Sequence, residues 1–110
     1  MNYLYLKKMK KPKILLADDD KNAADGLRKI LIQDGYDTSC VYTGNEALHL
    51  IDTEHFDIVI TDMKLPDISG FSIIEKVKKK DPNIPVIMIT AFSSLQTAID
   101  AMKKGADDYL

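Results

Sequence analysis

Short apolar runs alternate along the chain with longer segments whose apolar residues recur at helical spacing. A continuous apolar run such as Ile14–Ala17 is typical of a strand that is buried on both faces. Strands are predicted over Ile14–Ala17, Asp37–Tyr42, Asp57–Asp62 and Val86–Ile89, and a fifth begins at Asp107. Each predicted strand ends where the sequence turns polar.

Four amphipathic helices are predicted between the strands, over about 21–34, 44–54, 70–80 and 94–104. Asp20 and Thr43 are placed to act as N-caps, and Glu46 completes a capping box with Thr43. Gly35 and Gly105 mark the ends of the first and last helices. Ser69 or Gly70 begins the third helix, and Ser93 or Ser94 caps the fourth.

The inward face of each helix follows from its apolar spacing. The predicted inward residues are Ala23, Ala24, Leu27, Ile30 and Leu31, then Ala47, Leu48 and Ile51, then Phe71, Ile74 and Val77, and finally Leu95, Ala98, Ile99 and Met102. Strand and helix alternate throughout, which indicates an α/β fold with a parallel sheet, helices on both faces and right-handed crossovers.

Polar residues follow the predicted strands at their carboxyl ends. Asp18 and Asp19 follow the first strand, Asp62 ends the third, and Thr90 ends the fourth. If the strand order is the flavodoxin-like 2-1-3-4-5, the first and third strands are neighbours at the switch point where ligands bind. Three carboxylates then meet in one crevice, where they repel one another. A hard divalent cation relieves that repulsion, and a small set of oxygen ligands points to Mg²⁺.

Other acids have simpler explanations as caps or loop residues, namely Asp20, Asp34, Asp67 and Asp81. The chain has no Gly-rich phosphate loop and no evident Ser-His pair, and its two histidines, His49 and His55, are predicted to lie on the surface. A carboxylate beside Mg²⁺ can instead attack a phosphoryl group and become an acyl phosphate. Asp62 would be that nucleophile, Thr90 could donate a hydrogen bond to a phosphoryl oxygen, and Ala91 would leave room for the donor.

Composition limits the alternatives. The 110 residues are 45% apolar and 29% charged, which is typical of one globular domain. The first 13 residues hold five lysines and no acid, so residues 14–110 carry a net charge of −7. This negative charge argues against nucleic-acid binding by the domain. No apolar run is long enough to span a membrane.

Residues 1–12 are predicted to be a disordered basic leader, with a tail that touches membrane or nucleic acid as the alternative. A single cysteine, Cys40, fits a reducing cytoplasm and a small buried residue.

Four motifs resemble the receiver domain of two-component response regulators, in that family's order and spacing over residues 13–110. They are Ile14–Asp20, Ile60–Gly70, Ile87–Ala91 and Lys104–Leu110. The resemblance implies the flavodoxin-like sheet of order 2-1-3-4-5. It also implies that a histidine kinase or phosphotransfer protein phosphorylates Asp62 and that the phosphoryl group is read by an output domain beyond residue 110.

The resemblance assigns further roles within the site. Asp18 and Asp19 match the acidic pair that holds Mg²⁺, together with Asp62 and the backbone carbonyl of Lys64. Thr90 matches the switch hydroxyl. Tyr109 matches the switch aromatic that moves inward on activation, although by itself it would be an edge-strand aromatic.

The sequence ends at Leu110, before the family's Lys-Pro pair and fifth helix. We therefore expect a sheet that is truncated in its fifth strand, with apolar surface uncovered and open to dimerisation or strand exchange. Such a chain is expected to bind Mg²⁺ but to be phosphorylated and switched poorly.

Several functional interpretations remain open. The segment Thr97–Leu110 is most similar to receivers of the NtrC type, which are joined to ATPase and DNA-binding domains. A Mg²⁺-dependent phosphatase of the haloacid dehalogenase type is the second alternative, because that family also carries two aspartates at the spacing of Asp18 and Asp20. Its nucleophile is on the first strand, however, whereas Asp62 ends the third. A degenerate receiver that acts only as a protein-binding module is the third alternative.

Overall fold

The computed structural model describes residues 11–89 and 95–109. In chain order, the elements are β1 (Lys13–Ala17), α2 (Lys21–Gln33), β2 (Asp37–Val41), α3 (Gly44–Thr53), β3 (Ile58–Asp62), α4 (Gly70–Lys80), β4 (Val86–Ile89), α5 (Leu95–Lys103) and β5 (Asp108–Tyr109). The helices and strands predicted from the sequence are therefore present, with limits that differ by at most one residue. None of the described helices has the length and apolar character needed to cross a membrane.

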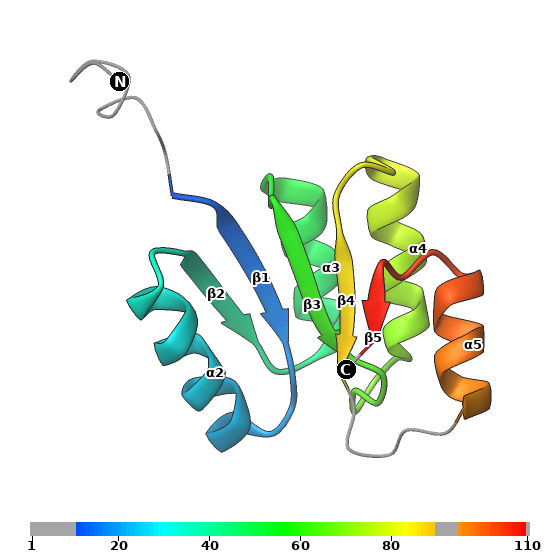
Figure 1. The fold of residues 1–110 in the computed structure, drawn as a ribbon, viewed down its shortest axis with the longest axis horizontal. Helices are drawn as coiled ribbons and strands as arrows, with labels where there is room; N and C mark the ends of the chain where they lie inside the picture. Colours follow the sequence, from blue (N-terminus) through cyan, green and yellow to red (C-terminus); the bar gives the residue numbers. More distant parts are fainter. Residues whose placement is uncertain (1–10, 90–94, 110) are drawn as a thin grey trace.

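The strands form one parallel sheet in the order β2-β1-β3-β4-β5, as predicted. Figure 1 shows α2 on one face of this sheet and α3 and α4 on the other, with α5 beside α4. Since all the strands run in the same direction, their carboxyl ends lie along one edge (Figure 1). The candidate site is at that edge.

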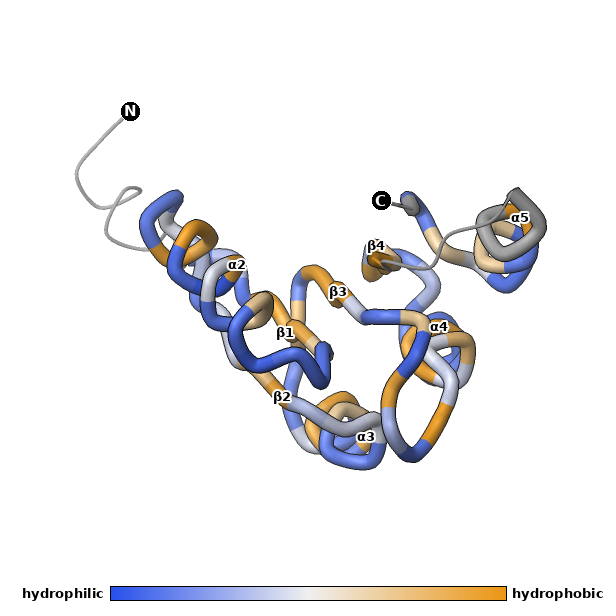
Figure 2. Tube along the Cα trace, turned by 90° about the horizontal axis from the view of Figure 1, so that it is seen from below, coloured by the Kyte–Doolittle hydropathy of each residue, from blue (hydrophilic) through white to orange (hydrophobic). Residues whose placement is uncertain are grey.

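The larger part of the core lies between the sheet and the helices α3, α4 and α5. Alternate residues of the central strands, such as Leu15 and Val59, meet Ile51, Ile74 and the rest of this cluster. The inward faces predicted for α3 and α4 are confirmed at the fully buried Ala47, Ile51, Ile74 and Val77, while Leu48 and Phe71 are partly buried. Figure 2 shows α3 and α4 on the same side of the sheet, each with hydrophobic segments along its trace.

The face of the sheet that carries α2 has a smaller core, centred on Ile14, Leu16, Ala24 and Ile60. The inward face predicted for α2 is partly wrong. Ala23 and Ile30 are exposed, Ile30 by 56%, whereas Ala24 is buried and Leu27 and Leu31 are half-buried. The physical reason is that α2 is the only described helix on this face, so no other described element covers the flank of α2 that carries Ala23 and Ile30.

The amphipathic stripe predicted for α5 also requires correction. Ile99 and Met102 are 38% and 49% exposed and Ala101 is fully buried, whereas the side chains of Leu95 and Ala98 lie outside the part that the structure describes. Ala101 belongs to the main core cluster, where a small side chain lets α5 approach the rest of the domain, while Ile99 and Met102 remain largely outside it. An ion pair of 3.3 Å between Lys104 and Glu75 of α4 joins the two elements.

The predicted helix caps are present. The Asp20 carboxylate accepts a 3.1 Å hydrogen bond from the Ala23 amide, and the Thr43 hydroxyl accepts one of 3.2 Å from the Glu46 amide. The Glu46 carboxylate accepts from the Thr43 hydroxyl rather than from the Thr43 amide of a capping box. Gly35 follows α2 with a φ of 94°, a conformation that glycine adopts without strain. The predicted cap at Ser93 or Ser94 lies outside the described residues.

Candidate functional site

Three carboxylates meet at the carboxyl ends of β1 and β3. Asp18 and Asp19 follow β1, and Asp62 is the last residue of the neighbouring strand β3. Each offers one oxygen atom to a group in which all the oxygens lie within 4.8 Å of one another. The parallel pairing brings them together, because Ala17, the last residue of β1, lies opposite Thr61, and Asp62 follows Thr61 as the last residue of β3.

Backbone hydrogen bonds orient two of these carboxylates. Asp18 Oδ1 accepts a 3.0 Å bond from the Asp20 amide, and Asp62 Oδ1 accepts a 3.2 Å bond from the Lys64 amide. The amide of Asp18 donates to the Val41 carbonyl at 3.1 Å, which fixes the turn after β1. The backbone of Lys64 therefore lies beside the Asp62 side chain.

The electrostatics of the site favour a cation. Burial raises the pKa of Asp18 and of Asp62, and neighbouring carboxylates raise both further. Asp18 is buried, Asp62 is half-buried and Asp19 is exposed, so one side of the group remains open to solvent. A donor set of closely spaced carboxylate oxygens fits a hard divalent cation such as Mg²⁺.

The loop after Asp62 is held tightly at its start and end. The Gly70 amide donates a 2.7 Å bond to the Met63 carbonyl, and Lys64 forms an isolated antiparallel bridge with Ser69. A Cβ atom on Gly70 would lie 2.2 Å from the backbone oxygen of Asp62. Residue 70 must therefore be glycine for the chain to close against the end of β3.

Some of the remaining predicted residues lie outside the described part of the chain, and the others can be placed in the structure. Thr90 and Ala91 lie outside the described residues. Tyr109 belongs to β5 and lies opposite Met88 of β4. His49 and His55 are exposed as predicted, and His55 is 3.4 Å from Asp57, which precedes β3 at the opposite edge of the sheet.

Cys40 is half-buried among the apolar residues on the α2 side of the sheet, in agreement with the prediction of a small packed residue. Burial raises the pKa of its thiol. The thiol donates a weak 3.9 Å bond to the Ala24 carbonyl. A protonated and packed thiol of this kind is a structural group.

Sequence reasoning missed the partner of one further acid. Asp67 was predicted to be a cap or loop residue, and it does accept hydrogen bonds, but from the amides of Gly44 and Asn45 at 2.8 Å each. These amides begin α3, more than 20 positions earlier in the chain. No local signal marks this pairing, since only the folded chain brings the two segments together.

Comparisons with known proteins agree with this geometry. The family model described as the response regulator receiver domain matches residues 14–110. The transcriptional regulatory protein ZraR of Salmonella typhimurium (strain LT2) is 37% identical over 97 residues, and the response regulator protein PilR of Pseudomonas aeruginosa is 40% identical over 102. The matches cover 88% and 93% of this chain but only 22% and 23% of those proteins.

Solved structures give the same result. The receiver domain of Francisella response regulator 1452 has a TM-score of 0.83 and 38% identity, covering 91% of this chain and 83% of that one. A Burkholderia pseudomallei response regulator with a phosphorylated aspartic acid, calcium ion and citrate has a TM-score of 0.85 and 32% identity, covering 91% and 59%. Fold, acidic cluster and family match coincide, and the chain belongs to the response regulator receiver domain family.

Proposed function

We propose that Asp62 accepts a phosphoryl group from a phosphohistidine of a histidine kinase or phosphotransfer protein. The observation that carries this proposal is the convergence of Asp18, Asp19 and Asp62 within 4.8 Å at one sheet edge. An Asp62 carboxylate oxygen would attack phosphorus while the P–N bond breaks, and the electron pair of that bond stays on the histidine ring. The product is an acyl phosphate on Asp62, which water later hydrolyses.

The cation of this site would be Mg²⁺, held by Asp18, Asp19, Asp62 and the backbone carbonyl of Lys64. Its positive charge would offset the charge that builds up on the transferring phosphoryl oxygens. Hydrogen bonds from the Asp20 and Lys64 amides already orient the Asp18 and Asp62 carboxylates. Burial raises the pKa of both acids and neighbouring carboxylates raise it further, so a cation would stabilise their ionised forms.

Thr90 and Tyr109 would carry the response to phosphorylation. Thr90 follows β4, the strand beside β3, and would donate its hydroxyl to a phosphoryl oxygen. Tyr109 belongs to β5, the strand beside β4, and would move inward when Thr90 does. The same receiver family match supports this assignment, which would transmit the change toward the β4–β5 side of the sheet.

The output of the complete protein is proposed to be transcriptional. ZraR is named a transcriptional regulatory protein and PilR a response regulator protein, and this chain spans about a fifth of each. An NtrC-type arrangement, with ATPase and DNA-binding domains after the receiver, would place phosphorylation of Asp62 upstream of promoter activation. The cytoplasm is the compartment where such a kinase, receiver and promoter meet.

The test is phosphorylation of the chain by a small phosphodonor in Mg²⁺, followed by borohydride trapping and peptide mass spectrometry. We expect label on Asp62, no label in Asp62→Asn, and no uptake when EDTA replaces Mg²⁺. Label on Asp18 would instead support the haloacid dehalogenase-type phosphatase. Absence of both label and Mg²⁺ binding would support a degenerate receiver that acts as a binding module.

A further inference from the structure

The loop between β3 and α4, residues 63–69, has a second anchor away from the acidic cluster. Its two ends are joined by the Lys64–Ser69 bridge and by the Gly70 amide bond to the Met63 carbonyl. Its outer part rests on the first turn of α3 through Asp67. The loop therefore spans the distance between the end of β3 and the start of α3.

Asp67 uses both carboxylate oxygens on α3. Oδ1 accepts from the Gly44 amide and Oδ2 from the Asn45 amide, each at 2.8 Å, and Oδ1 also accepts from the Ile68 amide at 3.1 Å. Thr43 binds the next amide, that of Glu46. The first three amides of α3 are thus all satisfied, two of them by a residue from a distant loop.

The contact is charged and closely packed. Hydrogen bonds from the Asn45 and Gly44 amides lower the pKa of Asp67, so the carboxylate is ionised at neutral pH and complements the positive end of the helix. A Cβ atom on Gly44 would lie 2.0 Å from Cγ1 of Ile68, which shows how closely the loop lies against the helix. Asp67 and Ile68 together fix the loop relative to α3.

This anchoring affects the backbone that faces Asp62. Lys64 lies three residues before Asp67 in the same short loop, and its amide donates to Asp62 Oδ1. The carbonyl of Lys64 is the proposed backbone ligand of Mg²⁺. If the outer part of the loop were free, the position of that carbonyl would be fixed only from the inner end of the loop, where the Lys64–Ser69 bridge and the Gly70–Met63 hydrogen bond lie.

We propose that Asp67 is a positioning residue for the phosphorylation site: by binding the first two amides of α3, it holds the backbone of Lys64 in place for the cation. This inference rests on the proposed function, because Mg²⁺ binding at the proposed site is the quantity that tests it. The hydrogen bonds described for Asp67 are to the amides of Gly44, Asn45 and Ile68, so Asp67 acts on the acidic cluster through the loop. Loss of its hydrogen bonds should weaken Mg²⁺ binding without changing the ligands themselves.

The experiment is a Mg²⁺ titration of the 110-residue chain followed by amide chemical shifts of Asp18, Asp19 and Lys64. We expect Asp67→Ala to weaken Mg²⁺ binding by roughly tenfold, the effect typical of residues that support metal ligands. Asp67→Asn keeps one oxygen acceptor but no charge, and we expect it to lose clearly less affinity. Asp81→Ala is the matched control, because Asp81 also accepts a backbone amide, that of Asn83, in a loop remote from the site.

Each outcome decides the inference. Wild-type affinity in Asp67→Ala would overturn it, and so would an equal loss in Asp81→Ala, which would indicate general destabilisation. An equal loss in Asp67→Ala and Asp67→Asn would overturn it in favour of a simple charge effect. A wild-type chain that binds no Mg²⁺ would overturn the proposed cation site itself, and the inference with it. Should Asp67→Ala not fold, Asp67→Asn decides by itself: a loss of Mg²⁺ affinity relative to both wild type and Asp81→Ala supports the inference, and wild-type affinity overturns it.

Discussion

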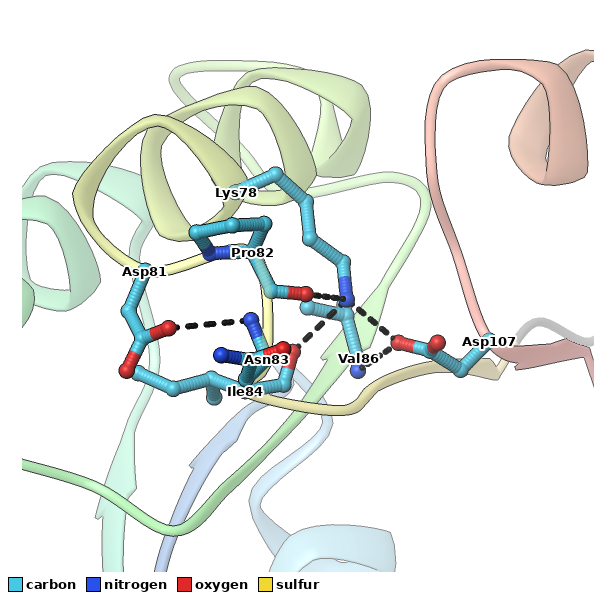
Figure 3. A network of polar contacts seen from close by, with 7 residues as sticks. All are labelled: Lys78, Asp81, Pro82, Asn83, Ile84, Val86 and Asp107. Atoms are coloured by element: carbon cyan, nitrogen blue, oxygen red, sulfur yellow. Dashed lines mark hydrogen bonds and ion pairs between the residues drawn. The ribbon is translucent and has the colours of Figure 1, made fainter.

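Lys78 of α4 and Asp107, which precedes β5, form an ion pair with 2.6 Å between Nζ and Oδ2 (Figure 3). The same Nζ donates to the carbonyl oxygen of Ile84 at 2.7 Å, and Asp107 Oδ2 accepts from the Val86 amide at 2.8 Å. This network joins the end of α4, the start of β4 and the connection from α5 to β5. It anchors β5 at the sheet edge, where the described residues Asp108 and Tyr109 pair with β4.

Replacing Lys78 by Met should destabilise the fold by roughly 1.5–3 kcal/mol, the usual range for a hydrogen-bonded charge that is largely buried. The Lys78 side chain is 18% exposed, so the Ile84 carbonyl and the Asp107 carboxylate would lose a partner that water replaces poorly. Urea unfolding followed by circular dichroism measures the effect. Lys79→Met, at an exposed neighbouring position, should stay near wild-type stability; an equal loss there would contradict the assignment.

The same pair predicts a pH dependence. The hydrogen bond from Lys78 lowers the pKa of Asp107 below that of the unfolded chain. An acid with a lowered folded pKa stabilises the protein above its unfolded pKa, and this contribution is lost as pH falls through the folded value. The stability difference between wild type and Asp107→Asn should therefore be present at neutral pH and shrink below about pH 4. The effect should be small, because the Asp107 side chain is half-exposed and solvent screens the interaction. A stability difference that grows on acidification would contradict this prediction.

Neutralising Asp62 should stabilise the chain when divalent cations are absent. The raised pKa values of Asp62 and Asp18 mean that the ionised cluster opposes folding, and an amide at position 62 could donate to Asp18 while still accepting from Lys64. Asp62→Asn should raise the thermal midpoint in EDTA and reduce the gain in midpoint that Mg²⁺ gives the wild type. Asp25→Asn, on the exposed face of α2, serves as the control for a general change in net charge. A lower midpoint for Asp62→Asn in EDTA would show that the repulsion is already relieved.

Two glycine substitutions should have opposite effects. A Cβ atom on Gly70 would lie 2.2 Å from the Asp62 oxygen and 2.9 Å from the Met63 Cα, both backbone atoms that cannot rotate away. Gly70→Ala should therefore cost about 1–3 kcal/mol or more in unfolding free energy. Gly26 lies inside α2 with nothing within 4 Å of a Cβ, and Gly26→Ala should stabilise by about 0.5–1 kcal/mol. Denaturant unfolding of the two variants side by side tests both; a neutral Gly70→Ala would contradict the described loop.

Local sequence was sufficient where the signal was local. The apolar run Ile14–Ala17 predicted β1 because a strand buried on both faces has no polar alternation. Asp20 and Thr43 predicted their helix starts because an N-cap bonds amides two or three residues ahead. These interactions lie within one or two turns of the chain, so their partners can be identified by counting residues.

The sequence predicted less well which apolar side chains of the helices are exposed to solvent. The apolar spacing of α2 and α5 correctly predicted helices, but Ile30, Ile99 and Met102 are exposed. Periodicity shows that a helix has an apolar side and cannot show which element covers it. In the described residues, a single helix covers one sheet face, and α5 approaches its neighbours through Ala101.

By itself, the sequence determined the alternation of strands and helices, the helix starts and the acids at the ends of β1 and β3. The parallel order then brings Asp18, Asp19 and Asp62 together, because strands that run the same way end at the same edge. Only the tertiary structure decided that Asp67 binds the start of α3 and that Lys78 reaches Asp107, since each pair is joined across more than 20 residues of chain. Such partners are chosen by packing in three dimensions, and no spacing along the chain encodes them.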